Sequence, residues 1–228
     1  MTRPLLILRP LEGALQTERR AQERGLQTVV DPLFAVEPVA WSGPAAQDFD
    51  ALLLTSANAV TRGGAQLDAY KSLPVLAVGE TTARVAADAG FQVEQTGASG
   101  GQSLLNSLGA DQCRSILWLA GEQHSRLDAG ERALHIVPVY RSRAVALGEK
   151  AVACLQRETV VLLHSARAAR HLVAELDRLH IKRDRHHVVA FSGKVAEAAG
   201  QGWRSLHRAD RPDDDALLSL ATGLCRSE

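Results

Sequence analysis

The turns that follow short apolar runs hold most of the residues able to bind a ligand. They supply small hydroxyl residues, glycine and an occasional cation, each directly before a segment with a helical pattern. Amide groups that are free at helix N-termini bind anions. If these turns meet at one edge of a sheet, they predict a neutral, amide-rich site for carboxylates or phosphates. The candidate residues are Arg9, Ser56, Asn58, Gly79, Thr81, Thr82, Ser165, Ser192 and Lys194.

Helix capping is the alternative interpretation of the hydroxyl residues in these turns. Ser56, Thr81 and Ser165 each stand where a side-chain oxygen could accept a hydrogen bond from an amide of the first helical turn. Capping and anion binding are compatible, because one cap leaves other amides of that turn free.

Tyr140 is a candidate for proton transfer. It is one of only two tyrosines, and it lies beside Arg141 and Arg143. A phenol at this position could donate a proton or bind a substrate. A tyrosine packed at the edge of a domain is the other interpretation, and the residues alone leave both open.

Signatures of other chemistries are missing from the sequence. It contains no G-x-G-x-x-G after the first apolar run, no G-x-x-x-x-G-K-[ST] and no H-E-x-x-H. Asp213-Asp214-Asp215 resembles a metal cluster, but it follows Pro212 and so predicts the first turn of a helix. His186-His187 lies in a charged stretch and is expected to be solvated rather than to bind a metal.

Short apolar runs alternate with helical patterns along the chain. Each run has four residues and is apolar throughout, which is typical of strands covered by helices on both faces. Helices are expected between most of them, for example over Glu12–Arg24, Thr81–Ala89 and Ala166–Leu179. This alternation predicts an α/β fold with largely parallel sheets. The runs are LLIL (5–8), ALLL (51–54), VLAV (75–78), ILWL (116–119), VVLL (160–163) and VVAF (188–191).

The chain also repeats itself at a nearly constant offset. LLILRP (5–10) matches ILWLAG (116–121) at an offset of 111, and LLLTSANAV (52–60) matches VLLHSARAA (161–169) at an offset of 109. VLAVGETTARVAA resembles VVAFSGKVAEAAG at an offset of 113. The repeat predicts two similar α/β halves, near 1–112 and 113–228. Residues 33–39 and 137–145 are β-prone and contain proline, so they predict either a ribbon between domains or edge strands.

The composition restricts the class of protein. The 228 residues carry 26 Lys and Arg against 26 Asp and Glu, so the formal net charge is zero. The zero net charge and the low share of aromatic residues, 4%, disfavour nucleic-acid binding. No apolar run is long enough for a membrane span or a signal peptide. The three cysteines are widely spaced, which disfavours a disulfide framework and favours a cytoplasmic location.

The ordered set of motifs resembles the uroporphyrinogen-III synthase family over nearly the whole chain. The segments that carry the resemblance are LLILRP, LLLTSANAV, AVGETTARVAADAGF, SGGQSLL, VPVYRSR, VLLHSARAA and VVAFSGKVAEAA. It implies two similar α/β domains joined by a two-stranded β ribbon, with a cleft between them. Residues 1–38 and 139–228 would form one discontinuous domain, and residues 39–138 the other.

The resemblance also implies an activity. The substrate would be hydroxymethylbilane, a linear tetrapyrrole with eight carboxylates, and the product uroporphyrinogen III with ring D inverted, plus water. No metal or organic cofactor is expected. Tyr140 matches the family's tyrosine in the connecting strand, so it is the candidate catalytic acid. Carboxylate binding would fall to Ser56, Asn58, Gly79, Thr81, Thr82, Gly101 and Ser165.

One departure and one alternative accompany this interpretation. The threonine of the Gly79–Ala83 turn is lost in the second half, where Lys194 offers a positive charge for substrate pairing or simple solvation. A two-domain anion-binding or sensor protein without turnover is the alternative function. The expected partner is the small-molecule substrate, with no nucleic acid and no membrane. A transient contact with the preceding, bilane-forming enzyme is compatible with that role.

Overall fold

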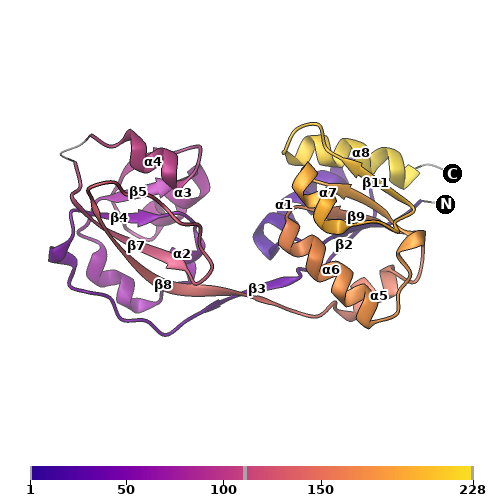
Figure 1. Cartoon of the computed structure of the whole chain (residues 1–228), viewed down its shortest axis with the longest axis horizontal. Coiled ribbons are helices and arrows are strands. Elements are labelled where there is room, and N and C mark those ends of the chain that lie inside the picture. The colour runs from indigo at the N-terminus through magenta and orange to yellow at the C-terminus, as the bar shows by residue number, and fades with distance from the viewer. Residues whose placement is uncertain (1, 110–111, 227–228) are drawn as a thin grey trace. The chain divides into compact units, whose positions relative to one another are not determined.

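The computed structural model describes residues 2–109 and 112–226, which form two compact units (Figure 1). Unit 1 is discontinuous and combines the chain up to Ala35 with the chain from Ala144 onward. Unit 2 is the continuous segment Val36–Arg143. Both are α/β layers in which helices cover a mostly parallel sheet, as the alternation of strand and helix patterns predicts.

Unit 1 contains a five-stranded sheet in the order β11-β10-β9-β1-β2. Every neighbouring pair is parallel. The short strand β1 lies between β9 and β2, so the first residues of the chain supply an interior strand to a sheet built mainly from its last third. The strands are β1 (Leu5–Ile7), β2 (Thr28–Val30), β9 (Val160–Leu163), β10 (His187–Ala190) and β11 (Ser205–Arg208).

Helices cover both faces of this sheet, because its interior strands are apolar on both sides. Leu6, Val161 and Val188 belong to one buried cluster, whereas Leu5 and Val160 belong to another. Successive side chains of a strand point to opposite faces, so each run serves two cores. The helices are α1 (Leu11–Glu23), α5 (Glu149–Cys154), α6 (Ala166–Arg178), α7 (Gly193–Ala199) and α8 (Asp214–Arg226), with a 3₁₀ turn at Arg183–Arg185.

Unit 2 contains a six-stranded sheet in the order β3-β8-β7-β4-β5-β6. It also has two buried clusters, one on each face. The strands are β3 (Phe34–Pro38), β4 (Ala51–Leu54), β5 (Val75–Val78), β6 (Val93–Gly97), β7 (Ser115–Gly121) and β8 (Ala133–Ala144). The helices are α2 (Asn58–Arg62), α3 (Glu80–Asp88) and α4 (Gly101–Ser107), with 3₁₀ turns at Ala46–Asp48 and Ala65–Tyr70.

The internal repeat maps one sheet onto the other. The matched pairs β1 with β7, β9 with β4, and β10 with β5 occupy equivalent positions in the orders β11-β10-β9-β1-β2 and β6-β5-β4-β7-β8. The repeated halves of the sequence are nevertheless not the compact units. β1 of the first half lies in unit 1, and β7 of the second half lies in unit 2.

Strands β3 and β8 carry the chain from one unit to the other (Figure 1). The amide of Val145 donates to the carbonyl of Leu33, and that of Val39 donates to the carbonyl of Val139, so the two strands run antiparallel. The ribbon interpretation of residues 33–39 and 137–145 is confirmed. In the structure the boundaries between the units fall between residues 35 and 36 and between residues 143 and 144. The resemblance implied domain boundaries at 38/39 and 138/139.

The two adjacent histidines correct one expectation. His186 is fully buried and His187 is 7% exposed, so the prediction that they are solvated is wrong. His187 is the first residue of β10, and Glu158 and Ser205 hydrogen-bond its ring nitrogens at 2.9 and 2.7 Å. The charged stretch before them ends where the interior strand begins.

The acidic triplet behaves as predicted. Asp214 is the first residue of α8, and Asp213 Oδ1 accepts a hydrogen bond from the amide of Ala216 at 2.8 Å. Among the described residues no group of three or more His, Cys, Asp or Glu is placed to hold a metal ion. No helix in the described part of the chain is long and apolar enough to cross a membrane.

Candidate active site

The carboxyl edge of the sheet in unit 1 gathers four of the predicted residues. Arg9 follows β1 and stands two residues before α1, whereas Ser165 and Ser192 follow β9 and β10 and stand directly before α6 and α7. Lys194 is the second residue of α7 and is exposed. Because these strands are parallel neighbours, their ends and the helix starts after them lie at the same edge.

Capping holds for one hydroxyl residue of the three predicted. Ser165 Oγ accepts a hydrogen bond from the amide of Ala168 at 3.1 Å and caps α6. Thr81 does not cap α3, because Gly79 is the N-cap and Thr81 lies inside the first turn. Ser56 Oγ accepts from the amide of Asn58 at 3.2 Å, but the N-cap of α2 is Ala57.

Arg9 is held in place by residues distant in the sequence. Its Nη1 atom donates to both oxygens of Asp214, at 2.9 and 3.0 Å, and to Thr17 Oγ1 at 3.2 Å. The Thr17 hydroxyl donates in turn to Asp214 Oδ2 at 2.8 Å. The side chain of Arg9 is 30% exposed and that of Asp214 is 14% exposed. This ion pair is therefore only partly accessible to water.

His164 completes this polar cluster from the end of β9. Its Nε2 atom lies 3.3 Å from Asp214 Oδ1, and its ring packs against Phe191 with centroids 5.7 Å apart. Burial lowers the pKa of His164, and the charge of Arg9 lowers it further. The nearby carboxylate of Asp214 acts in the opposite direction and raises this pKa, but by less than burial lowers it. Burial alone would raise the pKa of Asp214, but the nearby His164 ring, the hydrogen bond from Thr17 and the charge of Arg9 bring it to about 2. Asp214 is therefore a carboxylate at neutral pH.

The carboxyl edge of the sheet in unit 2 gathers the other candidates. Ser56 and Asn58 follow β4, and Gly79 follows β5 with a φ of +83°. Gly101 begins α4 after β6, where a Cβ atom would lie 3.2 Å from Thr55 Cγ2 and 3.0 Å from Leu127 Cδ1. Glycine at this position therefore lets α4 pack closely against the turn after β4.

Gly79 has open space where a side chain would stand. A Cβ atom added there would meet no heavy atom within 4 Å among the described residues. Thr81 is exposed in the same turn, whereas Thr82 is buried. Any contact of this turn with a ligand would accordingly use the hydroxyl of Thr81 and backbone amides rather than the side chain of Thr82.

Tyr140 lies at the same edge as Ser56. In β8 it pairs with Gly121, the last residue of β7, at a shift in register. A Cβ atom on Gly121 would come within 2.8 Å of the Tyr140 ring, so the ring lies against that glycine. Tyr140 is half-buried and packs against the core on one face of the sheet. The neighbouring Arg141 and Arg143 both pair with Glu37 across the ribbon, at 3.2 and 2.9 Å.

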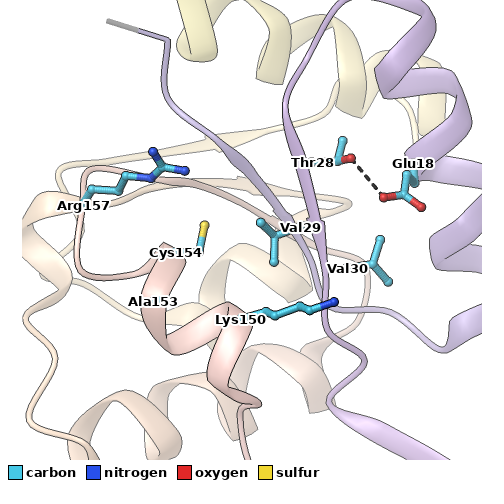
Figure 2. A pocket seen from close by; sticks show the side chains of 8 residues that line it. All are labelled: Glu18, Thr28, Val29, Val30, Lys150, Ala153, Cys154 and Arg157. Carbon is cyan, nitrogen blue, oxygen red and sulfur yellow. Dashed lines mark hydrogen bonds between the residues drawn. The ribbon is translucent and has the colours of Figure 1, made fainter.

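A cavity elsewhere in unit 1 contains none of the predicted residues. Its volume is about 500 Å³, and it lies beside the edge strand β2, between that strand and α5 (Figure 2). Glu18 accepts a hydrogen bond from Thr28 on one side of it, at 3.0 Å. We assign no part of the site to this cavity. Its lining residues are Glu18, Thr28, Val29, Val30, Lys150, Ala153, Cys154 and Arg157.

The family model for uroporphyrinogen-III synthase HemD matches residues 16–219. This chain belongs to the uroporphyrinogen-III synthase family. Enzymes of this family are cyclising lyases of haem biosynthesis and act on a small tetrapyrrole substrate. The resemblance stated from the sequence motifs is confirmed, and with it the assignment of this chain as an enzyme of that class. No curated protein matches the sequence.

Solved structures of the family share the fold. A uroporphyrinogen-III synthetase from Helicobacter pylori aligns with a TM-score of 0.66 at 17% identity, covering 97% of this chain and 99% of its own. A mutant uroporphyrinogen III synthase from Thermus thermophilus aligns with a TM-score of 0.52 at 18% identity, covering 98% and 100%. At these identities the likeness concerns the α/β architecture.

Sequence reasoning missed Thr17, His164 and Asp214 as members of the site. Asp214 was correctly placed at a helix start, but nothing in the pattern links it to Arg9, 205 positions away. His164 directly precedes Ser165 at the end of an apolar run, and that position was a signal that could have identified it.

Proposed function

We propose that this member of the uroporphyrinogen-III synthase family cyclises hydroxymethylbilane to uroporphyrinogen III, and that Tyr140 donates the proton that releases the terminal hydroxyl as water. The observation that carries this proposal is the position of Tyr140. It lies at the carboxyl edge of the sheet in unit 2, against Gly121 and at the same edge as the helix starts after β4 and β5. Ligands of open parallel sheets bind at this edge.

The reaction needs one acid and strict control of orientation. The pyrrole nitrogen helps to expel the hydroxyl, which takes a proton and leaves as water, and an azafulvene remains. The substituted carbon of ring D attacks the azafulvene and forms a spirocyclic intermediate. This intermediate fragments and closes again at the free carbon of ring D, which loses its hydrogen as a proton. That proton balances the one donated at the start, so the net change is the loss of water.

Orientation decides which isomer forms. Attack by the free carbon of ring D is the easier path, and it gives isomer I without an enzyme. The protein must hold the bilane so that the substituted carbon attacks first. We infer that the eight carboxylates provide the handles for this positioning. The proposed contacts are Arg9, Ser56, Asn58, Gly79, Thr81, Thr82, Gly101, Ser165, Ser192 and Lys194.

The chemistry of these contacts suits a polyanion. Most of them offer hydroxyl groups or backbone amides at helix starts, and Arg9 and Lys194 offer positive charge. Lys194 lies in the first turn of α7, where the helix dipole disfavours a cation, so an anionic ligand would compensate its charge.

The setting of the reaction is part of the proposal. We propose that it proceeds in the cytoplasm and without a metal or organic cofactor. Because the free bilane closes spontaneously to isomer I, a transient contact with the enzyme that forms it would shorten its exposure to water.

An isomer assay tests the proposed function. Hydroxymethylbilane is generated in the presence of the purified protein, the products are oxidised, and porphyrin isomers I and III are separated by chromatography. We expect mostly isomer III, with protein-free and heat-denatured samples giving isomer I. Isomer I alone, at the protein-free rate, would overturn the proposal. Binding of an octacarboxylate porphyrin without formation of isomer III would instead favour a ligand-binding protein without turnover.

A further inference from the structure

Arg9 is the one arginine among the predicted contacts, and other side chains hold its guanidinium group in place. Asp214 and Thr17 together engage Nη1, while Nε and Nη2 have no hydrogen-bond partner within residues 2–109 and 112–226. A guanidinium has five N–H donors, so three of them stay available for an anion. The group is therefore anchored by one nitrogen and open at the other two.

Gly13 is part of the same arrangement. A Cβ atom at this position of α1 would lie 2.5 Å from Arg9 Nε, 2.8 Å from Cζ and 2.9 Å from Nη2. Its φ is not in the left-handed region, and it lies in the first turn of a 13-residue helix. Alanine would suit that helix better than glycine. The glycine thus gives the guanidinium group room to lie against the helix.

His164 also lies beside Asp214. Both of its ring nitrogens are buried and have no hydrogen-bond partner in the described part of the chain, although Nε2 lies 3.3 Å from Asp214 Oδ1. A buried nitrogen cannot reach a substrate at the edge. Its effect is to enclose the carboxylate, so that Asp214 keeps one orientation and faces Arg9.

We propose that Gly13, Thr17 and Asp214 are positioning residues that hold Arg9 ready to bind a carboxylate of the substrate. This inference rests on the proposed function, because it names the group of the tetrapyrrole that this edge binds. Arg9 makes the contact with the anion, and the other three residues act through it. An arginine that is oriented before binding loses less conformational freedom when the anion arrives.

The first test separates binding from turnover. Steady-state kinetics with hydroxymethylbilane are measured for Arg9→Gln and Asp214→Asn, with thermal unfolding as a control for folding. We expect KM to rise about tenfold for Arg9→Gln and roughly threefold to tenfold for Asp214→Asn, with kcat nearly unchanged. In the double variant the effect should be no larger than that of Arg9→Gln, because Asp214 acts through Arg9. Unchanged KM values, or additive effects, would overturn the proposal.

The second test uses a substitution whose structural and functional effects have opposite signs. Gly13→Ala should keep or raise the melting temperature, yet raise KM severalfold, because the new methyl group displaces the guanidinium. Gly223→Ala in α8 is the matched control, since a Cβ atom there meets no heavy atom within 4 Å among the described residues. Equal KM values for the two alanine variants would contradict the role of Gly13.

A binding measurement keeps this inference separate from the proposed function. The wild-type isomer assay tests the activity alone. Fluorescence titration with uroporphyrin III, which carries eight carboxylates, tests Arg9 whether or not the protein turns over substrate. We expect Arg9→Gln and Gly13→Ala to weaken binding of this probe, and Gly223→Ala to leave it unchanged. Equal affinities for all four proteins would overturn the inference even where isomer III forms.

Discussion

Tyr140 is the residue on which the proposed proton transfer depends. Replacing it with phenylalanine keeps the ring against Gly121 but removes the only proton that the side chain can donate. We expect Tyr140→Phe to lower kcat by roughly 10²–10⁴-fold with little change in KM. A stopped-time assay with separation of isomers I and III measures this. Wild-type kinetics in the variant would assign the acid to another group.

Arg9 shows why a charged residue in a turn is not automatically a free cation. Its charge is already paired with Asp214, which remains ionised at neutral pH because its pKa is about 2. What Arg9 offers to a ligand is therefore geometry, in the form of unpaired N–H donors, as much as net charge.

His186 makes the stability of the fold depend on pH. Burial lowers its pKa to about 4, and the charge of Arg185 adds to the effect. The pKa of histidine in the unfolded chain is about 6.5, so below this pH the unfolded state binds more protons than the folded state. Stability is thus complete above about pH 6.5 and falls as the pH approaches 4. Through this group we expect a loss of about 2 kcal/mol between pH 7 and pH 5.

Urea denaturation at pH 7 and pH 5 measures this loss. His186→Gln cannot titrate, so its free energy of unfolding should fall less between the two pH values than that of the wild type. Some dependence should persist, because the pKa of His164 is also lowered by burial and acts with the same sign. The same slope in variant and wild type would show that His186 does not cause the effect.

At the scale of elements, the pairing of β7 with β8 controls where the phenol lies. Gly121→Ala places a methyl group within 2.8 Å of the Tyr140 ring, which must move. We expect the rate to fall by about 10²-fold, the effect that a misplacement of about 1 Å can have, with a smaller change in melting temperature. Gly109→Ala is the control, because its Cβ atom makes only ordinary contacts, the nearest at 3.5 Å. Equal activity of the two variants would contradict this role.

Interior strands could be predicted from the sequence, whereas three of the edge strands could not. The runs at 51–54, 75–78 and 160–163 coincide with β4, β5 and β9, because strands buried on both faces are apolar throughout. The edge strands β2, β6 and β11 have partly exposed side chains and contain polar residues, so no continuous apolar run marks them. Their positions depend on the neighbours beside which they lie, which a local pattern does not contain.

The candidate site divides in the same way. Residues that directly follow interior strands could be predicted, because a parallel sheet brings its strand ends to one edge. The partners that orient them come from elsewhere in the chain. Asp214 contacts Arg9 because α8 packs beside α1. A side chain at Gly13 would clash with Arg9, because the guanidinium group of Arg9 lies along α1.

At the scale of the whole molecule, the two units differ in continuity. Unit 2 is one uninterrupted segment with buried clusters on both faces of its sheet, whereas unit 1 needs both ends of the chain. We expect a fragment of residues 36–143 to unfold in a single cooperative transition by circular dichroism and urea titration. A fragment of residues 144–228 lacks β1 and β2 and should show no cooperative unfolding transition, so it serves as the control. A fragment of residues 36–143 without a cooperative transition would show that unit 2 depends on unit 1.

The position of β1 between β9 and β2 has a consequence for folding of the protein during its synthesis on the ribosome. Leu5 pairs with Val160, so the first strand leaves the exit tunnel long before its neighbour has been translated. At roughly 5–20 residues per second, that interval lasts on the order of 10–30 s. During this time unit 2 can complete its fold while an apolar N-terminal segment still lacks its central neighbour. Newly made chains should therefore present that segment to chaperones, and synthesis slowed between Leu5 and Val160 would lengthen the exposure.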